Sequence, residues 1–195
     1  MLMKNNKNIF LYLILIFFSL IQSLAADEFD ITALNIKLFQ DSEKIQAEGN
    51  VLIVGQDGII IESENATYDK KANIIDAKKS VKITDRKTND ELKSDKIRYS
   101  KNKEEILAEG NVFFKGSEGV TIETEIALYD KRSQVIKSDK LTKMNDGYGN
   151  SILLDMFSYS TKNKNLRSKG NIKITDKYEN KYFFEFRCCV FLGTK

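Results

Sequence analysis

Apolar residues return at a fixed interval along most of the chain. The unit Ala-Glu-Gly-Asn-Val occupies residues 47–51 and 108–112, and a weaker copy lies at 168–172. Successive copies are 61 and then 60 residues apart, and related units at 76–81 and 137–141 divide each interval in two. The sequence is therefore a series of repeats, each about half as long as that interval.

Apolar positions within the repeats lie at even offsets from one another. The last residue of each unit is apolar, another apolar residue stands six positions before it, and most units have a third two positions after it. Successive side chains of a β-strand alternate between its two faces, so even offsets place these side chains on one face. The residues predicted to form this apolar face are Ile45, Val51, Ile53, Val81, Ile83, Ile106, Val112, Phe114, Leu141, Ile172 and Ile174.

A second class of strand ends in tyrosine, at positions 68, 99, 129 and 159. A small or apolar residue stands two positions before each tyrosine, and another apolar residue stands seven positions before it. The separation between these two is odd, so a regular strand would put them on opposite faces. A β-bulge near the intervening acid, or a strand that is apolar on both faces, would reconcile the pattern. We expect these acids to face solvent or to pair with lysine rather than to bind metal; they are Glu64, Asp95, Glu125 and Asp155.

Short turn-like segments connect the predicted strands. Residues 55–58 and 116–119 are rich in glycine and follow strands of the first class, and 69–71 and 130–133 follow the second. Loops of this kind join antiparallel neighbours, whereas parallel strands need crossovers of about a dozen residues or more. The chain contains no proline, which fits continuous ladders because each proline removes a hydrogen-bond donor. We therefore predict an all-β antiparallel repeat meander, with a parallel β-helix as the alternative.

Residues 1–25 have the features of a secretory signal peptide. Two lysines precede an apolar run over residues 9–20, and Ser-Leu-Ala at 23–25 suits cleavage after Ala25. The apolar run is shorter than the roughly 20 residues that a spanning helix needs, although an uncleaved N-terminal anchor is the alternative. The predicted domains are the signal peptide at 1–25, the repeat domain at 26–184 and an atypical C-terminal tail at 185–195.

The amino-acid composition argues against a histidine-dependent enzyme and against a nucleic-acid-binding protein. The chain has 195 residues, with 31 Lys and Arg, 28 Asp and Glu, and no histidine or tryptophan. The lack of histidine excludes His-based catalytic triads and His-containing zinc sites, so we predict no enzymatic activity, no catalytic or metal-binding residues and no cofactor. Without the two lysines of the leader, 29 bases alternate with 28 acids along the chain. A nucleic-acid partner is therefore not expected.

The alternation of Ala-Glu-Gly-Asn-Val with Glu-Asn-Ala-Thr-Tyr-Asp, behind a signal peptide, resembles the OstA-like domain of lipopolysaccharide transport. The resemblance covers residues 28–184, and the best matches lie at 47–51, 64–69, 108–112 and 125–130. The family includes periplasmic shuttles and the N-terminal domain of the outer-membrane lipopolysaccharide-assembly protein, and the repeat is most like the latter. Members fold as an open β-jellyroll, in which two sheets form a slot for lipid acyl chains and neighbouring domains join edge to edge.

This resemblance implies a carrier in the periplasm of a Gram-negative envelope, associated with the outer membrane. The apolar face identified above would bind the acyl chains of lipopolysaccharide and pass them towards the outer membrane. The implied partners are lipopolysaccharide, related jellyroll transport proteins through edge-strand pairing, and the outer-membrane assembly complex. The alternatives are an inner-membrane anchored subunit of the same pathway, a β-solenoid scaffold that binds no lipid, and a β-helical polysaccharide-degrading enzyme. The residues alone leave open whether the interior is a slot or a closed core.

The tail departs from the repeat and from the family. Cys188 and Cys189 are adjacent, and a disulfide between neighbours would close a strained ring, so free thiols or an intermolecular disulfide are expected. The family's assembly protein is much longer than this chain. We therefore expect a leading piece of such a protein rather than a free shuttle.

Overall fold

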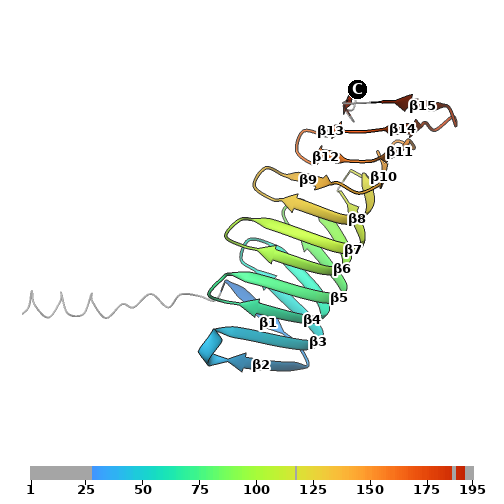
Figure 1. Cartoon of the computed structure of the whole chain (residues 1–195). Helices are drawn as coiled ribbons and strands as arrows, with labels where there is room; N and C mark the ends of the chain where they lie inside the picture. The colour runs from blue at the N-terminus through green and yellow to red at the C-terminus, as the bar shows by residue number, and fades with distance from the viewer. Residues whose placement is uncertain (1–27, 117, 186–187, 192–195) are drawn as a thin grey trace, which may run out of the picture.

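The computed structural model describes residues 28–116, 118–185 and 188–191. These residues form a stack of strands that rises from β2 at one end to β15 at the other, as Figure 1 shows. Among them, no helical segment has the length and apolar character needed to cross a bilayer. In chain order the elements are β1 (Phe29–Thr32), β2 (Asn35–Phe39), the 3-10 turn η1 (Gln40–Ser42), β3 (Lys44–Gly55), β4 (Ile59–Asp69), β5 (Ile74–Asp85), β6 (Asp90–Ser100), β7 (Glu105–Lys115), β8 (Thr121–Asp130), β9 (Val135–Ser138), β10 (Thr142–Asn145), β11 (Ser151–Leu154), β12 (Phe157–Ser160), β13 (Asn165–Ser168), β14 (Ile172–Thr175), β15 (Lys181–Phe184) and β16 (Cys188–Phe191).

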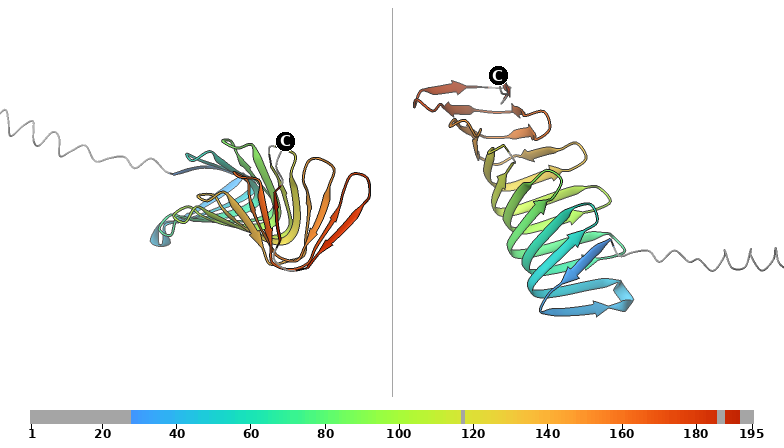
Figure 2. Two further views of the ribbon diagram at one scale, coloured as in Figure 1. Left: turned by 90° about the horizontal axis from the view of Figure 1, so that it is seen from above. Right: turned by 180° about the vertical axis from the view of Figure 1, so that it is seen from behind.

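The strands form one open antiparallel sheet that is folded along a bend into two half-sheets. The first half-sheet contains β2, one half of each long strand from β3 to β8, and then β9, β12, β13 and β16. The second contains β1, the other halves of the long strands, and then β10, β11, β14 and β15. Figure 2, on the left, looks along the stack and shows the half-sheets diverging from their common bend. Every strand pair in the described part is antiparallel, so the open β-jellyroll meander is confirmed and a parallel β-helix is excluded.

The bend consists of β-bulges at the repeated acids. The pairing of β3 with β4 shifts between Glu48 and Val51, and equivalent shifts follow in each neighbouring pair up to β8. In β4 the two successive residues Glu64 and Asn65 both face outward, which returns Ala66 to the interior. The bulge that the odd spacing predicted is therefore confirmed.

Strands β3, β5 and β7 cross the bend with two successive residues in the left-handed conformation. In β7 these are Gly110 and Asn111, with φ of 76° and 48°, and the same residue types stand at 49–50 in β3. In β5 the places are taken by Lys79 and Ser80, with φ of 65° and 52°. Glycine adopts this conformation readily, but β5 makes the same turn without glycine.

The mouth is the open side of the V, where hairpin tips of the two half-sheets meet. In the first half-sheet, inward side chains increase in size from the bend to the mouth. Beside the bend the inward residues of the first half-sheet are mostly alanines, namely Ala47, Ala66, Ala77, Ala108 and Ala127. At the bend itself the buried hydroxyls of Ser63 and Ser94 donate to backbone carbonyls two residues further on, at 3.1 and 2.9 Å. Near the mouth lie the buried rings of Tyr68, Tyr99, Tyr129 and Tyr159. This gradient in side-chain size lets the half-sheets pack closely along a V.

The last third of the chain differs from the predicted series of long strands, because each strand is interrupted at the bend. Backbone N–H groups there bond to side chains instead of the ladder: that of Lys140 to Ser138 Oγ at 3.1 Å, and that of Asn171 to Asp155 Oδ2 at 3.0 Å. Short polar side chains compete with strand pairing in this way. The sequence also gave no sign of β16, which pairs with β13. The predicted signal peptide lies outside the described residues.

Candidate functional site: the apolar inner face and its mouth

The predicted apolar face is the inner face of the folded sheet. Val51, Ile53, Val81, Ile83, Ile106, Val112, Phe114 and Ile172 are all buried in one continuous core, and Ile45 and Ile174 pack against it in partly buried positions. Buried and exposed residues alternate on both sides of the bend. The bulges shift the alternation so that the apolar residues on both sides point inward. The core also contains the residues that precede each tyrosine at two and seven positions, such as Ala66 and Ile61.

Leu141 is a correction to this set. It is 63% exposed and precedes β10, whereas the adjacent Thr142 is buried and faces inward. Thr142 Oγ1 donates to the Lys140 carbonyl at 2.8 Å and lies at hydrogen-bond distance, 3.0 Å, from Thr124 Oγ1, so the hydroxyl takes the inward position at this bend. The repeat is shifted by one residue here, which the sequence pattern did not reveal.

The inner face continues to both ends of the stack, where it is exposed. In β2, Ile36 lies opposite Ala47 and Leu38 opposite Ile45, so both extend the inward row, yet Leu38 is 67% exposed. At the other end Phe184 and Tyr182 lie opposite Ile172 and Ile174 of the same row, and Tyr182 is 46% exposed. In the part of the chain that the structure describes, β2 and β15 therefore present exposed apolar side chains at these ends. Sequence reasoning missed these end residues because they lie outside the repeat units.

Polar contacts join the half-sheets at the mouth. Asp57, in the turn between β3 and β4 of the second half-sheet, accepts hydrogen bonds on Oδ2 from Tyr99 Oη at 2.5 Å and from Lys131 Nζ at 3.0 Å. The Lys101 Nζ lies 2.9 Å from the same oxygen. We call Asp57, Tyr99, Lys101 and Lys131 the mouth cluster. The sequence could not have indicated it, because its members are 42 and 74 residues apart along the chain and lie on hairpins of opposite half-sheets.

The electrostatics of the mouth cluster follow from its position at the border of the core. Burial opposes ionisation of the Asp57 carboxyl, but the hydrogen bonds from Tyr99, Lys101 and Lys131 outweigh it and hold its pKa well below the usual range. Burial and the bond to Asp57 raise the pKa of Tyr99. Burial also raises the pKa of Tyr129 and of Tyr159 to about 12 in each case. Tyr99, Tyr129 and Tyr159 therefore stay protonated at physiological pH, and Asp57 stays an anion.

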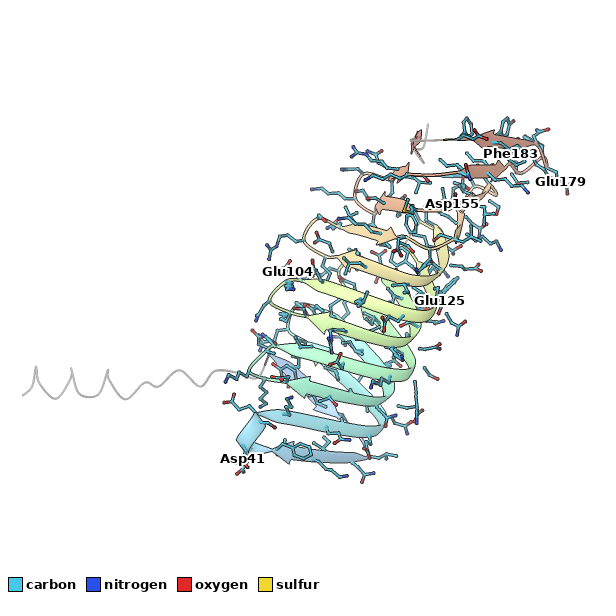
Figure 3. All side chains as sticks on the ribbon, in the orientation of Figure 1. Asp41, Glu104, Glu125, Asp155, Glu179 and Phe183 are labelled. Carbon is cyan, nitrogen blue, oxygen red and sulfur yellow. The ribbon has the colours of Figure 1, made fainter. Side chains whose placement is uncertain are left out.

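The repeated acids follow the outer side of the bend, where Figure 3 labels Glu125 and Asp155. Glu64, Asp95 and Glu125 are exposed, as predicted. The Asp95 carboxylate accepts a hydrogen bond from Asn111 Nδ2 at 2.9 Å, and Asp155 accepts one from a backbone N–H. Asp95 and Asp155 therefore tie neighbouring bends to each other, through an amide and through the backbone. In the described part of the chain, no group of acids and thiols is placed to hold a metal ion.

A groove of about 810 Å³ runs along the outside of the first half-sheet beside the bend. Its walls carry charges of both signs, including Lys78, Lys96 and the pair Asp76 and Arg98, whose Nε–Oδ1 distance is 2.8 Å. An exposed, neutralised and polar surface of this kind suits water better than an apolar ligand. The inner face is therefore the stronger candidate site.

Comparisons with known proteins give one kind of match. No family model and no curated protein matches the sequence. Among solved structures, the fold is similar to the crystal structure of LptH from Pseudomonas aeruginosa, described as the LptA-homologous periplasmic component of the conserved lipopolysaccharide transport device. The TM-score is 0.53, the sequences are 15% identical, and the match covers 57% of this chain and 82% of that one. At this identity the likeness establishes a common β-jellyroll fold.

Proposed function

We propose that this protein is a non-enzymatic carrier that holds the acyl chains of lipopolysaccharide against its inner face and passes them along the stack. The observation that carries the proposal is the apolar inner face that runs through every long strand and is still exposed at Leu38 of β2, at one edge of the first half-sheet, and at Phe184 of β15, at the far edge of the second. A globular sandwich with a core of its own would cover the ends of that face. A face that continues to open ends suits a ligand that slides from one molecule to the next.

The choice of lipopolysaccharide rests on the fold and on the sequence resemblance together. LptH, whose fold is similar, is a periplasmic component of lipopolysaccharide transport. The repeat units that resemble the OstA-like family form the strands of the inner face. Periplasmic localisation near the outer membrane follows from the same argument and from the predicted leader. The absence of histidine supports a role in binding rather than in catalysis.

The partners would be related jellyroll domains that join the ends of the stack. β2 and β15 are edge strands, each with one side unpaired in the described structure, and both are exposed along their full length. An edge strand offers free N–H and C=O groups for pairing with another chain, and apolar side chains beside it would add burial. In this arrangement, the inner faces of successive domains would form one continuous path to the outer-membrane assembly complex. The likeness of the repeat to the N-terminal domain of the assembly protein makes that domain the form we favour.

Photocrosslinking on one strand tests the carrier function, because β7 offers a matched pair of residues. Phe114 is buried on the inner face and its neighbour Phe113 faces outward. A benzophenone side chain that replaces Phe114 should capture lipopolysaccharide in living cells, and the same group at Phe113 should not. Both replacements add the same benzoyl group to a phenylalanine ring, so the two variants carry the same probe and differ in the face that presents it.

Two outcomes would contradict the proposal. Equal capture from both positions would indicate adsorption to the surface. No capture from Phe114, in a variant that keeps its β-sheet circular dichroism spectrum and wild-type cell level, would leave a packed core without a ligand. The same photocrosslinking side chain at the buried Val112 and at the exposed Asn111 repeats the test on the same strand, closer to the bend.

A further inference from the structure

The mouth cluster has the geometry of an anion-binding site that is occupied by a side chain of the protein itself. Three donors, the Tyr99 hydroxyl and the ammonium groups of Lys101 and Lys131, converge on one carboxylate oxygen at 2.5, 2.9 and 3.0 Å. Charge-assisted donors that converge on a single oxygen form the arrangement in which proteins bind oxyanions. Lys131 has a second acid, Asp85, at 4.0 Å. Among the residues that the structure describes, Asp57 is the acid within 3.0 Å of all three donors.

The two lysines lie at the border between water and the apolar interior. The Lys101 Nζ lies 5.7 Å from the centre of the Phe29 ring, and the Lys131 Nζ lies 5.5 Å from that of Tyr99. Phe29 packs edge-on against Tyr68, with ring centres 5.1 Å apart, and so belongs to the core. A molecule whose chains lay against the inner face would therefore have its head group beside these ammonium groups.

Asp57 lies in the short turn that joins β3 to β4, outside the paired residues of both strands. It stands between Gly55 and Gly58, and Gly58, with φ of 91°, donates its N–H to the Gly55 carbonyl at 3.1 Å. The donors, in contrast, belong to the other half-sheet: Tyr99 lies near the end of β6, and Lys101 and Lys131 directly follow β6 and β8. Parting the half-sheets at the mouth would separate the carboxylate from its donors and leave the donors together.

We propose that Tyr99, Lys101 and Lys131 form a head-group site for a phosphate-bearing amphiphile and that Asp57 takes the place of the anionic head while the mouth is closed. The inference rests on the proposed function, since the chains of the amphiphile must lie between the half-sheets. Their entry moves Asp57 away, and the phosphate of the head group accepts the three hydrogen bonds in its place. The exchange keeps the two ammonium groups neutralised in both states, so opening the mouth does not leave buried charge unpaired.

Calorimetric titration with three probes tests this site. Dodecyl phosphate and dodecyl maltoside, both below their micelle concentrations, share one chain and differ in head charge, and inorganic phosphate supplies the anion without a chain. The Lys101→Gln/Lys131→Gln variant should bind dodecyl phosphate about tenfold more weakly than wild type, because two charged hydrogen bonds are lost. The Asp57→Asn variant should bind it about threefold more tightly or better, because the competing carboxylate is gone. Affinity for dodecyl maltoside should change by less than about twofold, and Lys93→Gln on the outer face is the matched control.

The opposite signs of the two variants separate a head-group site from a structural brace. If Asp57 and the lysines only braced the mouth, the Asp57 and lysine variants would change the affinity for dodecyl phosphate in the same direction, and the inference would fall. Inorganic phosphate that bound as tightly as dodecyl phosphate would also overturn it, since the chain would then play no part. Binding of both amphiphiles with no dependence on the lysines would refute the head-group site but leave the carrier function standing. Failure of wild type to bind either amphiphile would refute both.

A measurement on wild type avoids any question about how the variants fold. Dodecyl phosphate should speed hydrogen exchange at the Gly58 amide, because the turn that carries Asp57 is displaced, and dodecyl maltoside at equal saturation should do so less. Unchanged exchange with saturating dodecyl phosphate would show that Asp57 keeps its place, which contradicts the exchange of anions.

Discussion

At the scale of single residues, four tyrosines in equivalent positions have different partners. Tyr99 donates to Asp57 across the mouth, whereas Tyr68 donates to the Asn73 side chain of the next turn in its own half-sheet, at 3.1 Å. The repeat thus determines where each tyrosine ring packs. The hydrogen-bond acceptor of each of these two hydroxyls is a residue outside the strands, Asp57 or Asn73. The polar chemistry of the mouth therefore depends on turn residues such as Asp57, which periodicity does not reveal.

The pKa of Asp57 makes stability depend on pH. Hydrogen bonds from Tyr99 and two lysines outweigh the effect of burial and hold this pKa below the value of about 3.9 in the unfolded chain. A carboxyl whose pKa is lower in the folded than in the unfolded chain stabilises the fold at pH values above the unfolded-state pKa. This stabilisation is lost as the pH falls below that pKa, because the unfolded chain binds the proton first. Asp57→Asn should therefore cost about 1–3 kcal/mol of unfolding free energy at pH 7. The difference from wild type should shrink progressively below about pH 4. Urea titrations check this, with exposed Asp139→Asn as control, and a difference independent of pH would contradict it.

At the scale of elements, hydrophobic periodicity predicted the strands well. The odd separation of Ile61 from Ala66 indicated a bulge or a strand that is apolar on both faces, and the structure has a bulge there. Periodicity did not predict that the strands after β8 break at the bend, because their interruption depends on hydrogen bonds of single polar side chains, such as Ser138. It also placed Leu141 on the inner face, since a shift of one residue leaves the repeat recognisable while reversing every side chain.

The bends of β5 and β7 allow a test of backbone strain in equivalent places. A methyl group on Gly110 would lie 2.4 Å from Asp95 Oδ2, and φ of 76° is unfavourable for any residue with a Cβ. Gly110→Ala should therefore lower the unfolding free energy by about 1–3 kcal/mol. Lys79 already has φ of 65°, so Lys79→Gly should leave stability unchanged or raise it by up to about 1 kcal/mol. Urea denaturation measures both, and an equal loss in the two variants would show that conformation at the bend is not the cause.

At the scale of the whole molecule, the structure has two different ends. One end presents β2 with Ile36 and Leu38, and the other presents β15 with Tyr182 and Phe184. The core between them is continuous and nearly dry, so the ends are where the apolar row meets water. Two unlike ends that bind each other generate open chains instead of closed dimers. The proposed edge pairing therefore predicts head-to-tail assembly even between copies of this chain.

Two variants that each disable one end test the direction of this assembly. Leu38→Asp places a carboxylate at the β2 end, and Phe184→Asp places one at the β15 end, so burial against a partner becomes costly in each case. Wild type should form oligomers whose mean size increases with concentration in analytical ultracentrifugation, and each variant alone should be monomeric, because every contact needs one intact end of each kind. An equimolar mixture should form dimers and nothing larger, because each variant supplies the end that the other lacks. Dimers in either variant alone would indicate a symmetric contact that joins like ends, and a mixture that stayed monomeric while wild type associated would place the contact away from β2 and β15.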